Sequence, residues 1–172
     1  MVRRGFVLVI VVIALVALAV ASGWAPWEES EPPPPGQAVV VRVVDGDTVV
    51  LRMQGGEESV RLIGVDTPET VKPDTPVQCY GPEASAHLHE LLADGSRVRV
   101  ARDAEARDHF GRLLLYLWRT EDDRFVNLDI VSGGFGRPLS IAPNTAHAAE
   151  LAAAADDARR AGRGLWSACP GG

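Results

Sequence analysis

The stretch from residue 39 to residue 65, VVVRVVDGDTVVLRMQGGEESVRLIGV, contains the clearest structural signal in the chain. β-Branched runs at 39–44 and 48–53 flank Asp45-Gly46-Asp47, which is a strong hairpin signal. A second, glycine-rich turn leads to a third predicted strand at 59–65. Three strands joined by turns this short predict an antiparallel meander.

Downstream of the meander, the pattern alternates between helices and strands. Gly81-Pro82 predicts the start of a helix, because a proline in the first turn loses no hydrogen bond, and Asp94-Gly95 predicts its end. Residues 97–102 and 112–118 are predicted strands. Five strands with packed helices predict an α+β, mainly β domain, and the strand count matches an OB-type barrel.

Two more helices are predicted in the C-terminal third, so that about three helices accompany the barrel. The first spans 127–132, and the second has Asn144 or Thr145 as its N-cap. The predicted apolar stripe of this last helix comprises Ala148, Leu151, Ala152 and Ala155.

Residues 1–22 have the composition of an export segment. Arg3 and Arg4 precede an apolar run, and Ala19-Val20-Ala21 fits the cleavage pattern of a signal peptide. The alternative is an uncleaved anchor that contacts the membrane through residues 5–24. In both cases we expect the rest of the chain to be extracellular, either secreted or tethered to the outer face of the cytoplasmic membrane.

An acidic, proline-rich linker at residues 23–37 precedes the predicted domain at residues 38–169. Its four consecutive prolines favour an extended spacer. The 172-residue chain is 47% hydrophobic, which excludes wholesale disorder. Its formal net charge of −6 argues against a protein that coats nucleic acid nonspecifically, because that mode needs many basic side chains.

The chain has two cysteines, Cys79 and Cys169. An even cysteine count in an exported domain suggests a disulfide, which would tie the loop before the first helix to the C-terminal tail. The alternative is two unpaired thiols.

Four carboxylates fall at predicted strand ends rather than across solvent faces; they are Asp45, Asp47, Asp66 and Glu69. Arg61 has the strand parity of Ile63 and Val65, so we expect it to project from an otherwise apolar face, and Arg112 begins a very apolar strand. Such arginines are costly unless carboxylates or a bound anion compensate them. Carboxylates suit a hard cation and arginines suit a phosphate, so the set predicts phosphodiester hydrolysis. The alternative for each carboxylate is a turn-capping role.

Five blocks of sequence, taken in order, resemble the staphylococcal-nuclease-like (thermonuclease) family. They are Val44-Asp-Gly-Asp-Thr48, Arg61-Leu-Ile-Gly-Val-Asp-Thr-Pro-Glu69, Tyr80-Gly-Pro-Glu-Ala-Ser85, Asp108-His-Phe-Gly-Arg112 and Gly164-Leu-Trp-Ser167. The resemblance covers residues 39–167. It implies an OB-type barrel with three helices, and cleavage of DNA and RNA with Ca²⁺ to leave 3′-phosphates.

The resemblance also implies a metal site. Asp47 and Asp66 would supply side-chain ligands to Ca²⁺, and Thr67 would supply a backbone carbonyl. Asp45 would order the water shell of the metal from just outside.

Three further residues take catalytic roles by the same resemblance. Glu69 would act as general base or position the attacking water. Arg61 and Arg112 would hold the phosphate and stabilise the charge that grows on it in the transition state. The implied function is a calcium-dependent endonuclease of broad specificity that degrades extracellular DNA or RNA, and we expect a monomer.

Four positions depart from the best-known enzyme of the family. Leu139 and Ile141 stand where that enzyme has tyrosines that pack on the substrate nucleotide. His109 and Phe110, at the positions of a basic residue and a tyrosine, are candidate substrate contacts. We therefore expect reduced base stacking and weaker substrate binding than in a basic relative.

Two other classes of function remain open from the sequence. One is a catalytically silent OB-fold module that binds nucleic acid or a cell-envelope partner. The other is an accessory barrel with a structural role at the membrane. The intact set of five predicted catalytic and metal-binding side chains disfavours the first, although the acidic surface favours it slightly, and only the N-terminal segment supports the second.

Overall fold

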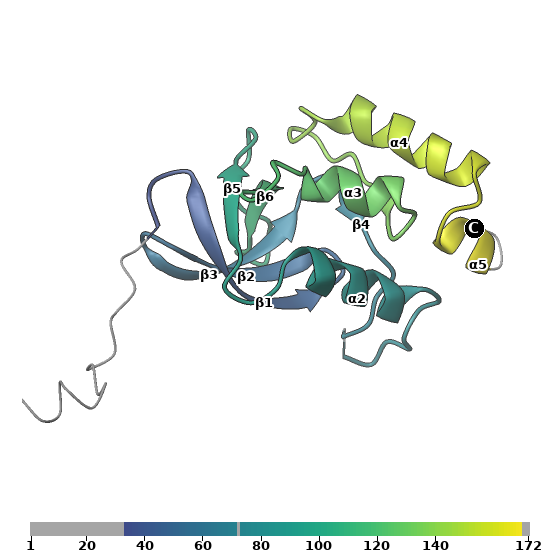
Figure 1. The fold of residues 1–172 in the computed structure, drawn as a ribbon, viewed down its shortest axis with the longest axis horizontal. Helices are drawn as coiled ribbons and strands as arrows, with labels where there is room; N and C mark the ends of the chain where they lie inside the picture. Colours follow the sequence, from purple (N-terminus) through teal and green to yellow (C-terminus); the bar gives the residue numbers. More distant parts are fainter. Residues whose placement is uncertain (1–32, 72, 170–172) are drawn as a thin grey trace, which may run out of the picture. The chain divides into compact units, whose positions relative to one another are not determined.

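A computed structural model describes residues 33–71 and 73–169, in which five strands form a closed barrel in the order β1-β2-β3-β6-β5 (Figure 1). These strands are β1 (Gln37–Asp45), β2 (Thr48–Met53), β3 (Gly56–Leu62), β5 (Arg97–Ala101) and β6 (Leu113–Arg119). The predicted five-stranded, mainly β barrel is therefore confirmed.

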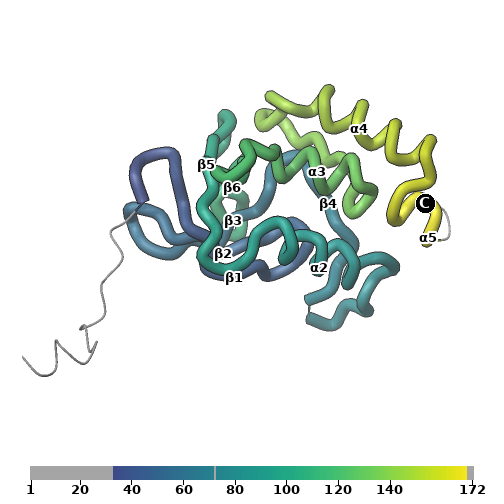
Figure 2. Tube along the Cα trace, in the orientation of Figure 1, coloured from purple at the N-terminus to yellow at the C-terminus, as the bar shows by residue number. Residues whose placement is uncertain are grey.

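Four helices and a small second sheet complete the described part of the chain. The helices are α2 (Gly81–Leu91), α3 (Val126–Ser132), α4 (Ala148–Arg160) and α5 (Leu165–Ala168). The second sheet pairs β4 (Val65–Asp66) with β7 (Arg137–Pro138). Helices α3 and α4 run side by side, and α2 contacts β1 (Figure 2). The fourth helix, α5, is a single turn that the sequence did not predict.

Strand β1 contains two irregularities that decide which of its side chains face the core. The pairing register with β2 shifts between Val40 and Arg42, and again between Val43 and Asp45. Strict alternation would bury Arg42 together with Val40. The shifts instead leave Arg42 exposed and bury Val43 and Asp45, as β-bulges do when they re-aim side chains.

The single strand predicted over 59–65 is wrong, because the chain turns at Gly64. Gly64 has a φ of 79°, which favours glycine, and β3 ends at Leu62 before β4 begins at Val65. The parity argument for Arg61 therefore fails. Val60 and Leu62 face the core, whereas Arg61 lies on the opposite side of β3.

The barrel closes through a parallel pair between β3 and β6, in which Arg61 lies opposite Leu114. The buried side chain of Asn127 stabilises this closure from α3. Its Nδ2 donates to the carbonyl of Ile63 at 2.8 Å, and its Oδ1 accepts from the backbone N–H of Leu117 at 3.0 Å. One side chain thus satisfies backbone groups at the β3 turn and on β6.

The predicted N-cap of the last helix is also wrong. The residue at the N-cap of α4 is His147, and its side chain makes no capping bond. Asn144 instead pairs with both backbone groups of Glu105, accepting at 2.7 Å and donating at 3.0 Å. The buried stripe of α4 includes the predicted Leu151 and Ala155, but its third member is Ala158, whereas Ala152 is exposed and Ala148 only half-buried.

A disulfide joins Cys79 to Cys169 across a sequence separation of 90 residues, which confirms the predicted pairing. The predicted export segment at 1–22, its membrane contact at 5–24 and most of the 23–37 linker lie outside the described residues. Within 33–71 and 73–169, no helix is both long enough and apolar enough to span a bilayer.

Helices α2 and α3 are joined by a hydrogen bond between His87 and Asp129. The His87 ring lies 2.7 Å from Asp129 and stacks on Phe135 with 3.8 Å between ring centroids. The hydrogen bond from His87 and the charge of Arg124 hold the pKa of Asp129 below its usual value, although partial burial opposes this. The ionised form of Asp129 therefore stabilises the folded state.

Replacement of Asn127 by alanine should lower the free energy of unfolding by about 2–4 kcal/mol, because it leaves two buried backbone groups without partners. Urea denaturation would measure the change. The exposed Ser140→Ala variant is the control, and a loss below about 0.5 kcal/mol in Asn127→Ala would contradict the assigned role.

Asp129→Asn should lower stability at pH 6 and have much less effect at pH 3. The folded-state pKa of Asp129 is lowered, so its contribution is present above the unfolded pKa of about 4 and is lost as pH falls through the folded value. Urea denaturation at both pH values would test this. The exposed Asp156→Asn variant should show no such pH-dependent difference, and an equal effect of Asp129→Asn at both pH values would count against the prediction.

Candidate active site

The carboxylate of Asp47 lies at the centre of the predicted site and is only 7% exposed. Its Oδ2 accepts from the backbone N–H and the hydroxyl of Thr67, both at 3.0 Å, and lies 3.1 Å from Nη1 of Arg61. Its Oδ1 accepts from the Thr48 hydroxyl at 3.0 Å. Asp47 therefore joins the first hairpin, strand β3 and the segment after β4.

Arg61 connects this buried carboxylate to a more exposed one. Its Nη1 donates to the carbonyl of Val65 at 2.6 Å as well as facing Asp47, and its Nη2 donates to Oδ1 of Asp66 at 3.2 Å. The Gly64 turn makes this possible, because it brings β4 back beside the end of β3.

Asp66 is the exposed acid of the group, with 57% of its side chain accessible. Partial burial and the negative charges of Asp47 and Glu69 raise its pKa, while Arg61 and Arg137 act in the opposite direction. Burial is the main cause of the raised pKa, because the two arginines offset the two neighbouring carboxylates.

Asp45, the last residue of β1, contacts the loop that follows β4 and carries Glu69. Oδ1 of Asp45 accepts from the Thr70 hydroxyl at 2.6 Å, and Oε1 of Glu69 accepts from the backbone N–H groups of Thr70 and Val71 at 3.0 and 2.9 Å. Burial, with the neighbouring Glu69 and Asp47 carboxylates, raises the pKa of Asp45 despite its bond to Thr70. The contacts place Asp45 as an anchor of the loop that bears Glu69.

The donors fit a Ca²⁺ ion held by few protein ligands. No group of three or more His, Cys, Asp or Glu side chains among the described residues is arranged to hold a metal. Any ion here would therefore depend on the Asp47 and Asp66 carboxylates, the Thr67 carbonyl and water, a hard-oxygen set that Ca²⁺ accepts in flexible geometry. Oδ1 of Asp47 has one donor among the described residues, the Thr48 hydroxyl, which leaves it a lone pair for such an ion.

Arg112 lies in the turn just before β6 and is oriented by Asp108. Its Nε donates to Oδ2 of Asp108 at 2.7 Å, and its backbone N–H donates to Oδ1 at 2.9 Å. Burial opposes ionisation of Asp108, but these bonds outweigh it and lower the pKa of the carboxyl. Within the described residues, the terminal nitrogens of Arg112 have no hydrogen-bond partner, so this end of the fork can take a phosphate.

Both arginines line one cleft of about 400 Å³. The register of β3 and β6 explains this, because Arg61 lies opposite Leu114, two residues after Arg112. Asp47, Asp66 and Glu69 do not line the cleft. Arg61 therefore connects the group of acids to the cleft.

Aliphatic side chains and His109 form much of the remaining wall of the cleft, together with the polar side chains of Glu105, Asp108 and Asn144. His109, Leu139 and Ile141 line it, and Ile141 is 61% exposed. Phe110 is 73% exposed, and its ring contacts that of His109 in a tilted arrangement with 3.7 Å between centroids, while the Arg112 guanidinium lies 5.5 Å from the centre of the Phe110 ring. The predicted substrate contacts therefore gather beside Arg112.

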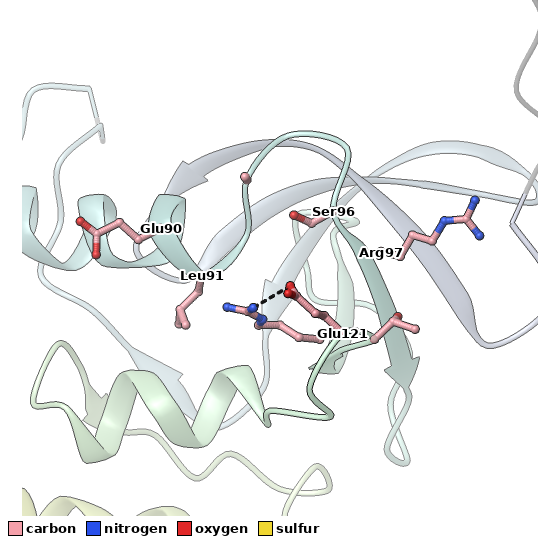
Figure 3. A pocket seen from close by; sticks show the side chains of 8 residues that line it. Glu90, Leu91, Ser96, Arg97 and Glu121 are labelled. Carbon is pink, nitrogen blue, oxygen red and sulfur yellow. Dashed lines mark hydrogen bonds and ion pairs between the residues drawn. The ribbon is translucent and has the colours of Figure 1, made fainter.

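A second hollow of similar volume lies away from these residues, between the end of α2 and strands β5 and β6 (Figure 3). Glu90, Arg97, Arg119 and Glu121 line it, and Arg119 pairs with Glu121 at 2.9 Å. Its acids and bases balance, so it offers no excess charge for an anion or a cation.

Sequence reasoning missed several partners of the predicted residues. Arg137 lies opposite Asp66 in the β4–β7 sheet, with its guanidinium 4.5 Å above the Trp166 ring. Gln78 pairs with Glu69 through two hydrogen bonds. Only Asp108 had a signal, the four-residue spacing to Arg112 within a recognised block.

Comparison with known proteins identifies the same family that the sequence blocks resemble. Residues 59–168 match the family described as staphylococcal nuclease homologue. A thermonuclease of Staphylococcus intermedius is 35% identical over 166 residues, which cover 96% of this chain and 97% of that protein. A thermonuclease of Staphylococcus hyicus is 38% identical over 128 residues, 74% of each chain. The SPbeta prophage-derived endonuclease YokF of Bacillus subtilis (strain 168) is 33% identical over 127 residues, 73% of this chain and 42% of that protein.

These relatives support a nuclease function. The similarity to the first thermonuclease extends over nearly the full length of both chains, and the family match covers the end of β3, strands β5 and β6, and all four described helices. The chain belongs to the staphylococcal nuclease family.

Proposed function

We propose that this protein is an exported, Ca²⁺-dependent nuclease that hydrolyses DNA or RNA endonucleolytically to 3′-phosphate products. The observation that supports this best is the position of Arg61, which pairs with Asp47 and Asp66 and also lines the cleft that holds Arg112. The names of the thermonuclease and endonuclease relatives support the same reaction. In this proposal the protein acts as a monomer.

The metal in this proposal is held by Asp47, Asp66 and the Thr67 carbonyl. When bound, Ca²⁺ supplies positive charge against a phosphate oxygen and favours ionisation of nearby water. Asp66 supports the assignment because its side chain is 57% accessible and it shares Arg61 with Asp47, so that a carboxylate oxygen is open to an ion beside the buried acid.

The two arginines bind the scissile phosphate. Asp108 holds Arg112 through Nε, so that its terminal nitrogens meet the phosphate with little loss of side-chain entropy. Arg61 is fixed by the Val65 carbonyl at 2.6 Å. Such preorganised donors stabilise the charge that develops on the phosphoryl oxygens in the transition state.

Glu69 accepts the proton of the attacking water or positions that water. A P–O bond to the water oxygen forms, and the bond from phosphorus to the 5′-oxygen breaks. The 5′-oxygen takes up a proton from solvent, while Arg112 assists its departure by donating a hydrogen bond to the charge that develops on it. The products are a 3′-phosphate and a 5′-hydroxyl.

Substrate affinity in this proposal rests on few contacts. Leu139 and Ile141 present aliphatic side chains to the cleft, so base stacking is left to His109 and Phe110. Stacking contributes roughly 1–3 kcal/mol per base, and its reduction supports weak, broad binding to nucleic acid.

Glu69→Gln should lower kcat by about 10²–10⁴, since the amide cannot accept a proton. The measurement is cleavage of plasmid DNA and single-stranded RNA by the full, oxidised chain at low salt, with Ca²⁺ and with chelator. Wild type should cut only with Ca²⁺.

The matched control is Glu83→Gln, in the first turn of α2, which should cut like wild type. Glu69→Gln activity within a few-fold of wild type would refute the role of Glu69. A folded chain that binds Ca²⁺ but cuts nothing would favour the silent binding module instead.

Calcium binding should depend on both acids. Asp47→Asn and Asp66→Asn should each weaken Ca²⁺ binding at least about tenfold, since each removes one charged oxygen ligand. Calorimetric titration, with and without a nucleotide bisphosphate, would measure this. Asp74→Asn, in the loop before α2, is the control. Equal affinity in all variants would remove the support for the metal assignment.

A further inference from the structure

We infer that Gln78 and the Cys79–Cys169 disulfide are positioning residues for Glu69, so that reduction of the disulfide lowers catalysis itself rather than stability alone. This inference rests on the proposed role of Glu69. Neither Gln78 nor the disulfide touches the cleft, and both act through the backbone of the loop that bears Glu69.

The loop between Glu69 and Gln78 is closed at its base by a pair of hydrogen bonds. The backbone N–H of Glu69 donates to Oε1 of Gln78 at 3.0 Å, and the backbone N–H of Gln78 donates to the carbonyl of Glu69 at 2.9 Å. Gln78 therefore takes up both backbone groups of the proposed general base. Movement of Gln78 moves Glu69.

The disulfide fixes the residue next to Gln78. Cys79 is bonded to Cys169, which follows α5, and a hollow of about 200 Å³ beside this bond is also lined by Pro68 and Gln78. The disulfide thus lies next to the residues that flank and hold Glu69. Its loss would leave Gln78 anchored only through the local chain.

Two other contacts restrict the loop that carries Glu69, so that a displacement of Gln78 is transmitted to Glu69. On the hairpin side, Thr70 is bound by Asp45 through its hydroxyl at 2.6 Å. On the helix side, Gly81 is so close that a Cβ there would lie 3.1 Å from the carbonyl oxygens of both Pro68 and Glu69. The Asp45 contact fixes one limb of the loop, and Gln78 with the disulfide fixes the other.

Reduction of the Cys79–Cys169 disulfide needs a dithiol reductant. The Sγ–Sγ bond breaks, Cys79 and Cys169 each gain one electron and one proton, and the reductant becomes its own disulfide. Cys79 is exposed, so a soluble dithiol can reach the bond. The nuclease would then have low activity under reducing conditions and full activity after oxidation outside the cytoplasm.

The test compares the full chain oxidised, reduced with dithiothreitol, and as Cys79→Ser/Cys169→Ser. Reduction and the double variant should each lower kcat about ten- to a hundredfold and leave KM within about twofold, because small displacements of a catalytic group cost rate rather than binding. Amide hydrogen exchange at Glu69, Thr70 and Val71 should become at least about tenfold faster. Gln78→Ala, which keeps the disulfide, should show the same kcat loss, and Gln78→Glu, which keeps the acceptor oxygen, should restore most of it.

A core variant separates positioning from stability. Leu51→Ala is destabilised within the barrel but retains the loop contacts and the disulfide, and should keep wild-type kcat at a temperature where it is folded. An equal kcat loss in Leu51→Ala would overturn the inference. So would unchanged exchange at Glu69, Thr70 and Val71 on reduction. If the oxidised wild type cuts nothing, the nuclease proposal fails, and hydrogen exchange alone decides whether Gln78 and the disulfide hold Glu69.

Discussion

The buried carboxylate of Asp47 is the constraint on which this site depends. A charge removed from water is costly unless it is paired and hydrogen-bonded, and Asp47 is satisfied by Thr48, Thr67 and Arg61 from three separate segments. The turn at Gly64 is what returns the chain to bring Thr67 within reach. The fold therefore positions Arg61 and the exposed Asp66 as a consequence of satisfying one buried charge.

The sequence predicted the elements of the fold well where the signal is local. The Asp45–Asp47 hairpin and the proline at the start of α2 need no tertiary context, and both were predicted correctly. The break at Gly64 was missed because the surrounding run is continuously apolar, so periodicity cannot show that the strand ends there. The bonds from Asn127 were also missed, because they join a helix to backbone groups 10 and 64 residues away in the sequence.

In the candidate site, too, the sequence motifs predicted the main residues but not the contacts that orient them. The motif blocks named Arg61 and Arg112, and the parallel β3–β6 pair brings both to one cleft. Asp108 is four residues from Arg112, but only the structure shows that it occupies Nε and leaves the far end of the guanidinium available. Gln78 is nine residues from Glu69, and no residue pattern predicts that their backbones meet.

An acidic chain that binds a polyanion must concentrate its positive charge. With a net charge of −6, the protein cannot attract nucleic acid through its whole surface, and long-range steering would be repulsive at low salt. Binding must then come from a few arginines that are already oriented, as Asp108 orients Arg112 and the Val65 carbonyl orients Arg61. Such preorganisation reduces the entropy lost on binding, which matters most where few contacts are made. Asp108 and Asp66 add to the negative net charge, but they also orient the arginines that bind the phosphate, which the net charge alone does not show.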